Sequence, residues 1–213
     1  MKILGIETST ETGSLALLEG GETRARAEID THERHSARII PILDRLLAEA
    51  GWTVDELEAV GAGLGPGSFT GIRVGLAVAR GLSFALKIPL KGVSSFEALA
   101  RGTEGEGRIA LLADARRGRI YLALYEKRGD GAVAIRPPSC VAAAEAAGLI
   151  GGNRVVTPHR ERLRSALGMD FPGEEARPDA VWIARIAGEK MAKDRGDESA
   201  AAVPLYLNTI SVK

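Results

Sequence analysis

The sequence lacks several features that would define a protein class at once. Its 213 residues include one cysteine, Cys140, so an internal disulfide is excluded and a reducing compartment is favoured. Lysine plus arginine and aspartate plus glutamate both number 28, so a protein that holds nucleic acid by its overall charge is not indicated. No apolar run approaches the roughly 20 residues of a membrane span, and Glu7 interrupts the N-terminal apolar run too early for a signal peptide. We therefore expect a cytoplasmic globular protein.

The most distinctive segment is Gly61–Gly75, which contains six glycines. It follows an apolar run and precedes a helix predicted over Phe69–Leu86, with Ser68 or Thr70 as the N-cap. Two interpretations stay open: a tight strand-to-helix turn with nothing bound, or an anion site at the helix start, where backbone N–H groups lack helical partners. The spacing matches neither the P-loop nor the dinucleotide-binding pattern, which favours the simple turn. In the anion-site interpretation, the contacts to phosphate come from Gly65, Gly67 and Ser68.

The helix predicted over Phe69–Leu86 is apolar around most of its circumference, with Arg73 and Arg80 as its only charges. Gly71, Gly75 and Ala79 form a stripe of small residues at spacing four, which would let a neighbouring helix approach closely. A helix that is apolar on most sides must be buried on most sides. One side can face a sheet, and the other needs a second cover. That cover is either a partner chain or the amphipathic helix predicted over Ser36–Gly51, and the residues alone do not decide between them.

The predicted elements occur in two similar series. Each half opens with antiparallel strands and continues into helices; in the second half, strands are expected over residues 109–113, 120–125, 133–135 and 154–157. The glycine-rich stretch near residue 102 separates the two halves. We therefore predict two subdomains, 1–102 and 103–213, with the terminal helix or tail packing back on the first. Paired halves of this kind indicate an α/β actin-like nucleotidyl fold, shared with sugar kinases, with a mixed sheet and helices in each subdomain. In that fold each half contributes a phosphate-facing hairpin turn, here Glu7–Gly13 and Asp114–Gly118. The alternative for the second segment is a simple hairpin turn with Gly118 at the position that needs positive φ.

Four motifs resemble one known family. They are Ile3–Ser9, the Gly-Pro-Gly-Ser-Phe-Thr-Gly-Ile-Arg block of residues 65–73, the Asp114–Gly118 segment and the Pro-Leu-Tyr-Leu tail at 204–207. Together these segments are similar to the TsaB (YeaZ) family. The resemblance implies a role in making threonylcarbamoyladenosine beside the anticodon of tRNAs that read codons starting with A. It further implies two partners, the catalytic paralogue TsaD and the ATPase TsaE, and only indirect contact with tRNA through the complex.

The resemblance also implies that this chain is not the catalyst. TsaD carries a His-Met-Glu-Gly-His segment whose histidines bind the metal, and the matching segment here is Ser95–Leu99. Leucine cannot coordinate a metal, and a hydroxyl is a poor substitute for imidazole. We expect no metal site and no catalytic residue. No His-Glu-x-x-His motif of a metalloprotease is present either.

Nucleotide binding stays open at this point. The hydroxyls of the first turn and the carboxylate of the second could face a phosphate; these residues are Thr8, Ser9, Thr10 and Asp114. Glu7 stands where actin-like kinases usually have aspartate, and Pro158–Arg160 replaces the glycine-rich adenosine loop. We expect that the chain requires no cofactor, with ATP or ADP and magnesium restricted to the interface of the complex. The alternative is an actin-like small-molecule kinase or ATPase.

Family membership predicts a four-helix interface built from the helices over Ser36–Gly51 and Phe69–Leu86 with the same two helices of TsaD. The candidate contact residues are Ile39, Leu43, Leu47, Val74, Val78 and Leu82. Without TsaD the same surface is expected to form a homodimer. Locally basic positions could also hold phosphate backbone, although solvated turn and helix faces explain them as well. These positions are Arg116, Arg117, Arg119, Arg160, Arg162 and Arg164.

Overall fold

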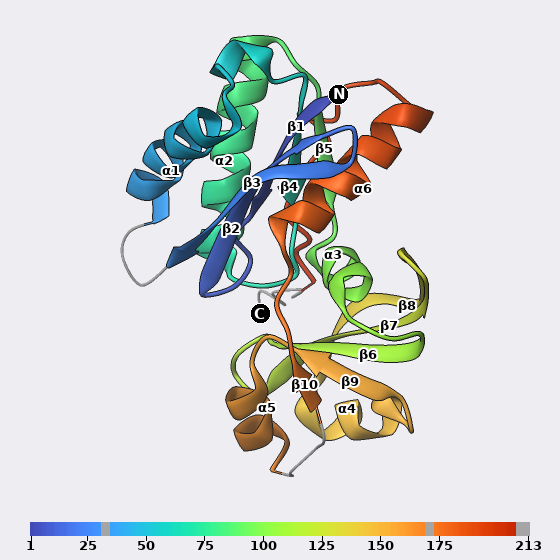
Figure 1. Ribbon diagram of the computed structural model, residues 1–213. Coiled ribbons are helices and arrows are strands. Elements are labelled where there is room, and N and C mark those ends of the chain that lie inside the picture. Colours follow the sequence, from blue (N-terminus) through green and yellow to red (C-terminus); the bar gives the residue numbers. More distant parts are fainter. Residues whose placement is uncertain (31–34, 169–172, 208–213) are drawn as a thin grey trace.

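The computed structural model describes residues 1–30, 35–168 and 173–207. It contains two five-stranded sheets, one in each lobe of the molecule (Figure 1). All strands of the first sheet come from residues before Gly102, and all strands of the second come from residues after it.

The first sheet has the strand order β3-β2-β1-β4-β5. Its strands are β1 (Lys2–Glu7), β2 (Thr12–Glu19), β3 (Glu22–Asp30), β4 (Ala59–Gly63) and β5 (Leu90–Val93). The first three strands form an antiparallel meander, as predicted, and β4 and β5 continue parallel to β1. The carboxyl end of β1 therefore lies at the same sheet edge as the carboxyl end of β4, where the glycine-rich segment begins.

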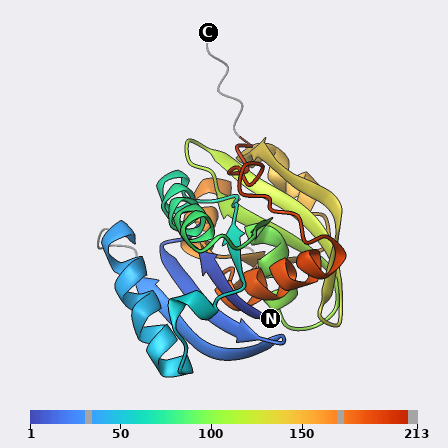
Figure 2. The ribbon, with the colours of Figure 1, turned by 90° about the horizontal axis from the view of Figure 1, so that it is seen from above.

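Helices cover both faces of the first sheet (Figure 2). α1 (His35–Ala50) and α2 (Phe69–Leu86) pack on one face, and α6 (Ala180–Lys193) packs on the other. Alternate residues along β1 supply the two cores: Leu4 and Ile6 join the α1–α2 side, whereas Ile3 joins the α6 side. This period of two follows from strand geometry.

The second sheet has the order β10-β9-β6-β7-β8. Its strands are β6 (Gly107–Asp114), β7 (Arg119–Arg128), β8 (Gly131–Ala142), β9 (Arg154–Thr157) and β10 (Gly173–Glu175). α4 (Ala143–Ile150) and α5 (Arg160–Leu167) cover the outer face. α3 (Ser95–Gly102) covers the inner face and also contacts α6, so it lies between the two lobes.

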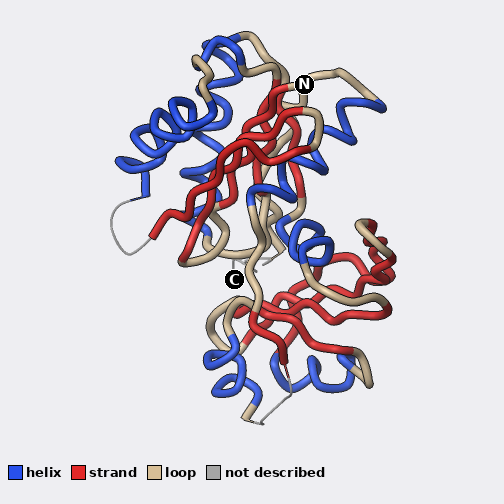
Figure 3. Tube along the Cα trace, in the orientation of Figure 1, coloured by secondary structure: helices blue, strands red, loops and turns tan. Residues whose placement is uncertain are grey.

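Most predicted elements are confirmed, and two differ (Figure 3). β8 was expected only over residues 133–135, yet it runs from Gly131 to Ala142 through Pro137 and Pro138. Proline is tolerated there because β8 is an edge strand and its pairing with β7 shifts register next to these prolines. β10 was not predicted, since three residues carry almost no periodic signal.

Candidate functional site

The first hairpin turn begins at Glu7, the last residue of β1. Its carboxylate is fully buried: Oε1 accepts the Ser9 N–H at 2.6 Å and Oε2 accepts the Ser95 hydroxyl at 2.7 Å. Burial raises the pKa of Glu7 above its ordinary value, while the hydrogen bonds from Ser9 and Ser95 act in the opposite direction. A Cβ at Gly63 would overlap this carboxylate, so the glycine on β4 makes room for it. Glu7 thus ties β1 to α3 inside the protein.

The next residues of this turn are covered by the glycine-rich segment. The Thr8 hydroxyl donates to the Gly71 carbonyl at 2.8 Å, and the Ser68 N–H donates to the Ser9 carbonyl at 2.7 Å. A Cβ at Gly71 would overlap the carbonyl oxygen of Thr8, and one at Gly67 would overlap that of Ser9. The glycines therefore let backbone approach backbone, which is the simple-turn interpretation of this segment.

Most of the predicted phosphate contacts in this region have hydrogen-bond partners within the protein, but the buried hydroxyl oxygen of Ser9 has none among the described residues. Thr10 donates its hydroxyl to the Thr12 carbonyl at 2.7 Å, and Gly65 donates its N–H to the Ser95 hydroxyl oxygen at 3.1 Å. Ser68 is the N-cap of α2, because its side chain accepts the Gly71 N–H at 3.2 Å. These groups serve internal packing and capping in this conformation.

The second hairpin turn is built differently. The Asp114 carboxylate accepts the Arg116 N–H at 2.8 Å, and the Asp114 N–H donates to Nδ1 of His159 at 3.2 Å. Arg116, Arg117 and Gly118 all have positive φ, and all three are exposed. The predicted left-handed conformation of Gly118 is confirmed, whereas the two left-handed arginines were not expected. Burial and the nearby positive charge of Arg162 lower the pKa of His159, which favours the neutral form that accepts this hydrogen bond.

The space between the two turns is closed. A hollow lined by Ser9, Thr10, Gly67, Ala113 and His159, among others, has no volume for a water-sized molecule. Ser9 and Thr10 of the first turn line this hollow, whereas Asp114 of the second turn does not.

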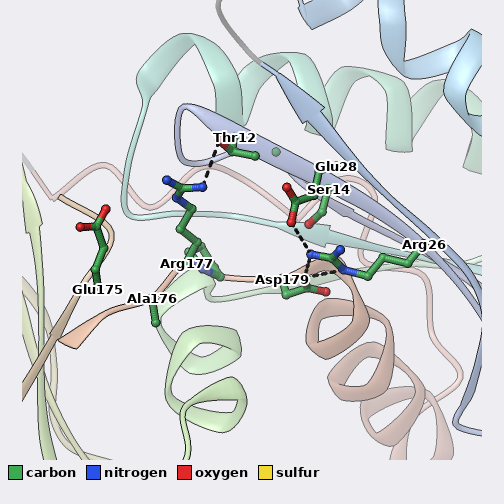
Figure 4. A pocket seen from close by; sticks show the side chains of 10 residues that line it. Thr12, Ser14, Arg26, Glu28, Glu175, Ala176, Arg177 and Asp179 are labelled. Carbon is green, nitrogen blue, oxygen red and sulfur yellow. Dashed lines mark hydrogen bonds and ion pairs between the residues drawn. The ribbon is translucent and has the colours of Figure 1, made fainter.

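Two open cavities lie along one side of the junction between the lobes. The larger one measures about 480 Å³ and is lined by two arginines and three carboxylates: Arg26 pairs with Asp179 at 2.5 Å and with Glu28 at 2.9 Å, while Arg177 donates to the Thr12 hydroxyl at 3.3 Å (Figure 4). The smaller one, about 230 Å³, shares Thr12 and Arg177 with the first. Neither cavity has a recognisable sequence pattern, because the lining residues are scattered over both lobes.

The predicted interface residues fall into two groups. Ile39, Leu43 and Leu47 have at most 5% of their surface exposed and belong to the core between α1 and the first sheet. For these three the prediction is corrected: they are core residues because they face β2 and β3. The other three, which are half-buried against the same core and still reach the surface, are Val74, Val78 and Leu82.

The outer face of α2 is exposed and largely apolar. Phe84 is 88% exposed and Phe69 is 56% exposed. Exposed positions at helical spacing between these two rings are Arg73, Ala77 and Gly81, and Ala85 is exposed directly after Phe84. We call this set of six residues the α2 outer face. The stripe of Gly71 and Gly75, predicted to admit a neighbouring helix, instead faces Thr8 inside the protein.

One end of the α2 outer face is fixed by the C-terminal segment. The guanidinium of Arg73 lies 3.7 Å from the centre of the Phe69 ring and donates to the Tyr206 hydroxyl at 2.9 Å. The Phe69 and Tyr206 rings stack with centroids 5.6 Å apart. Because both rings are more than half exposed, they extend the apolar area beyond the helix itself.

Within residues 1–30, 35–168 and 173–207, no group of three or more His, Cys, Asp or Glu residues is arranged to hold a metal ion. At the positions that match the TsaD metal ligands, Ser95 donates to Glu7 and Leu99 is buried in the core of the second sheet. Both side chains therefore have structural roles.

Comparisons with known proteins agree with this description. A family model described as "TsaD: tRNA N6-adenosine threonylcarbamoyltransferase" matches residues 29–180. The TsaB protein of Escherichia coli is 37% identical over 134 residues, which cover 62% of this chain and 58% of that protein. The TsaB protein of Bacillus subtilis is 40% identical over 129 residues, which cover 59% and 56%. The chain thus matches somewhat more than half the length of these curated relatives.

Longer matches come from two other proteins. An uncharacterized protein of Mycobacterium tuberculosis is 31% identical over 213 residues, covering 99% of this chain and 93% of that protein. The solved structure of YeaZ from Pseudomonas aeruginosa superposes with a TM-score of 0.81 and 27% identity, covering 97% of this chain and 99% of that one.

A more distant structure shares the fold alone. The activator of 2-hydroxyisocaproyl-CoA dehydratase from Clostridium difficile has a TM-score of 0.52 at 9% identity and covers 91% of this chain and 96% of that one. Together with the two mixed sheets, these matches confirm the predicted actin-like fold. The chain belongs to the family that the TsaD model describes and, within it, to the TsaB (YeaZ) proteins.

Proposed function

We propose that this chain is a cytoplasmic, non-catalytic subunit required to make threonylcarbamoyladenosine beside the anticodon of tRNAs that read codons starting with A. It acts by binding the catalytic paralogue TsaD through α1 and α2, and the ATPase TsaE joins this pair. The observation that carries the proposal is the α2 outer face, an exposed apolar surface on a chain whose curated relatives are named for this biosynthesis.

The α2 outer face has the shape that helix packing needs. Small residues at Ala77, Gly81 and Ala85 let a second helix approach closely, and Phe84 supplies a large side chain to bury. Phe84 is nine-tenths exposed, which is unfavourable in water and typical of an interaction surface. α2 also has the length and apolar composition of a membrane span, but Ile72, Leu76 and Ala79 are buried toward the first sheet. If α2 packs between the first sheet and a helix of a partner, its apolar residues on both sides are buried. Alone, the chain would pair with a second copy through this surface.

A non-catalytic role is consistent with how the candidate catalytic groups are used. Glu7 is buried and bonded to Ser9 and Ser95, and the hydroxyl of Thr8 is bonded to Gly71. A kinase would need such groups to face its phosphates. The chain therefore requires no nucleotide of its own, and ATP or ADP with magnesium would be held at the TsaD interface. Calorimetry with ATP and magnesium on the isolated chain is expected to show no tight binding; micromolar binding with turnover would favour a kinase or ATPase instead.

The interface is tested by charge placement. Phe84→Asp is expected to abolish co-purification with TsaD, because a carboxylate would be buried without a partner. Cells that carry only this variant should lose threonylcarbamoyladenosine, measured by mass spectrometry of digested tRNA. The matched control is Val133→Asp, which places the same charge at an exposed apolar residue of β8, 72% exposed, in the other lobe.

The control is expected to retain both TsaD and the modified nucleoside. Full recovery of TsaD by the Phe84→Asp chain would reject the α2 interface. Normal modification in cells that lack the chain altogether would reject the function.

A further inference from the structure

The turn between β6 and β7 and the start of α5 lie at one edge of the second sheet (Figure 1). β6 and β9 are parallel neighbours, so the segments that follow them emerge on the same side. The hydrogen bond from the Asp114 N–H to Nδ1 of His159 joins the two segments at 3.2 Å. Residues 116–119 and 160–164, far apart in the sequence, therefore share this edge.

This edge lies in the basic part of the chain. Between residues 107 and 178, twelve lysines and arginines stand against eight aspartates and glutamates, although the whole chain is neutral. Half of those twelve basic residues lie at this edge: Arg116, Arg117, Arg119, Arg160, Arg162 and Arg164. A charge difference between two parts of one chain is typical of proteins that contact nucleic acid.

The acidic residues at this edge neutralise it only in part. Arg162 pairs with Glu11 of the first lobe, and Arg164 pairs with Glu161 at 3.4 Å. Arg116 is 68% exposed and its guanidinium is 3.6 Å from Asp114. Arg119 donates to Sγ and to the carbonyl oxygen of Cys140 rather than to a carboxylate, and Glu145 is the nearby acid.

The backbone of the turn carries a second signal. Arg116 and Arg117 have φ of +65° and +52°, a left-handed conformation that costs free energy for any residue with a Cβ. Glycine or asparagine would adopt it more readily, and Gly118 does so next to them. Two exposed arginines in this conformation do not stabilise the turn. Their positive charge therefore indicates a role in binding.

We propose that these arginines form a surface that binds the phosphate backbone of tRNA directly. The surface, called the arginine edge, consists of Arg116, Arg117, Arg119, Arg160 and Arg164. The inference rests on the proposed function and adds a residue-level contact between this chain and the RNA. Arginine suits the role because its planar guanidinium donates two parallel hydrogen bonds to one phosphate.

The observations favour RNA over other anions. The adjacent cavity of about 230 Å³ is smaller than a typical small-molecule site, and two of its lining residues, Arg162 and Glu11, pair with each other, so it does not suit a nucleotide. Within the part of the chain that the structure describes, no large exposed apolar side chain lies among residues 114–119 or 159–164. A surface that inserts into a lipid interface would normally present one. The arginines of the β6–β7 turn are exposed and those of α5 are half-buried beside them. Charges spread in this way along one edge fit an extended backbone.

The test removes charge without harming the turn. Arg116→Asn combined with Arg117→Gly deletes two positive charges and supplies residues that accept positive φ. The control, Lys193→Gln with Arg195→Gln, removes the same charge from two exposed residues at the end of α6. Binding of a labelled tRNA to the complex of the full chain with TsaD is measured by fluorescence anisotropy at several salt concentrations.

The turn variant is expected to bind tRNA about tenfold more weakly near 0.1 M salt, with a shallower dependence of log Kd on log salt, because two phosphate contacts are lost. Its melting temperature and its recovery of TsaD should not fall, and the control should bind tRNA as the unaltered chain does. Equal weakening in both variants, or none in either, would overturn the arginine edge while leaving the TsaD interface intact.

The remaining outcomes also decide. If the chain recovers no TsaD, the proposed function fails, and the tRNA measurement is made on the chain alone. Weaker tRNA binding by the turn variant only would then support the arginine edge. No tRNA binding by the unaltered chain would overturn it. Selective loss of binding to vesicles of anionic phospholipid, with tRNA binding unchanged, would assign the edge to a membrane and overturn the RNA contact.

Discussion

The two hairpin turns occupy equivalent places in the two lobes, yet one is buried and the other is exposed. In the first, Thr8, Ser9 and Thr10 have at most 5% of their surface exposed, and the glycine-rich segment covers them. In the second, Arg116 and Arg117 project from the surface in a costly backbone conformation. The same fold position has thus been used once for packing and once for presenting charge.

The difference follows from what stands beside each turn. β4 leads into Gly65, Gly67 and Gly71, whose missing side chains let the backbone close on the first turn. β9 leads into Pro158, His159 and Arg160, which carry side chains and leave the second turn uncovered. In the predicted actin-like arrangement both turns would face a phosphate. In this chain, the first turn belongs to the core and the second to the surface.

The largest expected effect comes from adding a methyl group beside the first turn. Gly71→Ala is expected to lower the free energy of unfolding by about 3 kcal/mol, because the Cβ would overlap the Thr8 carbonyl oxygen and neither backbone can move easily. Urea denaturation followed by circular dichroism measures this. The matched control is Gly118→Ala in the second turn, where no atom lies within 4 Å of the added Cβ and only the positive φ is penalised, by about 1 kcal/mol. Equal losses in the two variants would show that packing does not distinguish the turns.

A smaller effect is expected from neutralising Glu7. Because burial raises its pKa in the folded state, the folded chain binds more protons than the unfolded chain between pH 4.5, the ordinary value, and the raised pKa. Stability therefore falls as pH rises through this range. Glu7→Gln, which has no charge to bury, should lack this component and gain stability relative to the unaltered chain as pH rises. Urea denaturation between pH 4 and 8 measures the free energy of unfolding of both chains. The same pH dependence in both would contradict a raised pKa of Glu7 in the folded chain.

The smallest effect is expected in the second turn. Arg117→Gly should raise the free energy of unfolding by about 0.5 kcal/mol, because glycine adopts a φ of +52° without a Cβ penalty, offset in part by its greater freedom in the unfolded chain. The same urea denaturation, at low salt and high salt, separates backbone strain from charge repulsion. A loss of stability would mean that the Arg117 side chain supports the fold, and the contrast between the turns would weaken.

The sequence predicted much of the fold because local signals were strong. α2 was expected over Phe69–Leu86 and is found there, with Ser68 as its cap. β9 was expected over residues 154–157 and is confirmed. β8 is longer than predicted and runs through two prolines, which normally end strands; only its edge position, a tertiary feature, permits them.

The site was less predictable, since it depends on which residues meet across the chain. The glycine stripe on α2 was recognised, but spacing alone does not say whether Gly71 and Gly75 face a partner helix or Thr8 of the same chain. Likewise Leu43 and Leu47 share the apolar face of α1, and only the packing of that face on β2 and β3 assigns them to the core. The exposure of Phe84 has no signature in a helix that is apolar on nearly every side.

The central claim is that the α2 outer face binds TsaD. Sedimentation velocity on an equimolar mixture of this chain and TsaD tests it most directly, with the Phe84→Asp variant and the Val133→Asp control run at the same concentration. We expect a single heteromeric species for the unaltered chain and the control, and two separate species with the Phe84→Asp chain as a folded monomer. A heteromer of unchanged size and affinity with Phe84→Asp would contradict the claim.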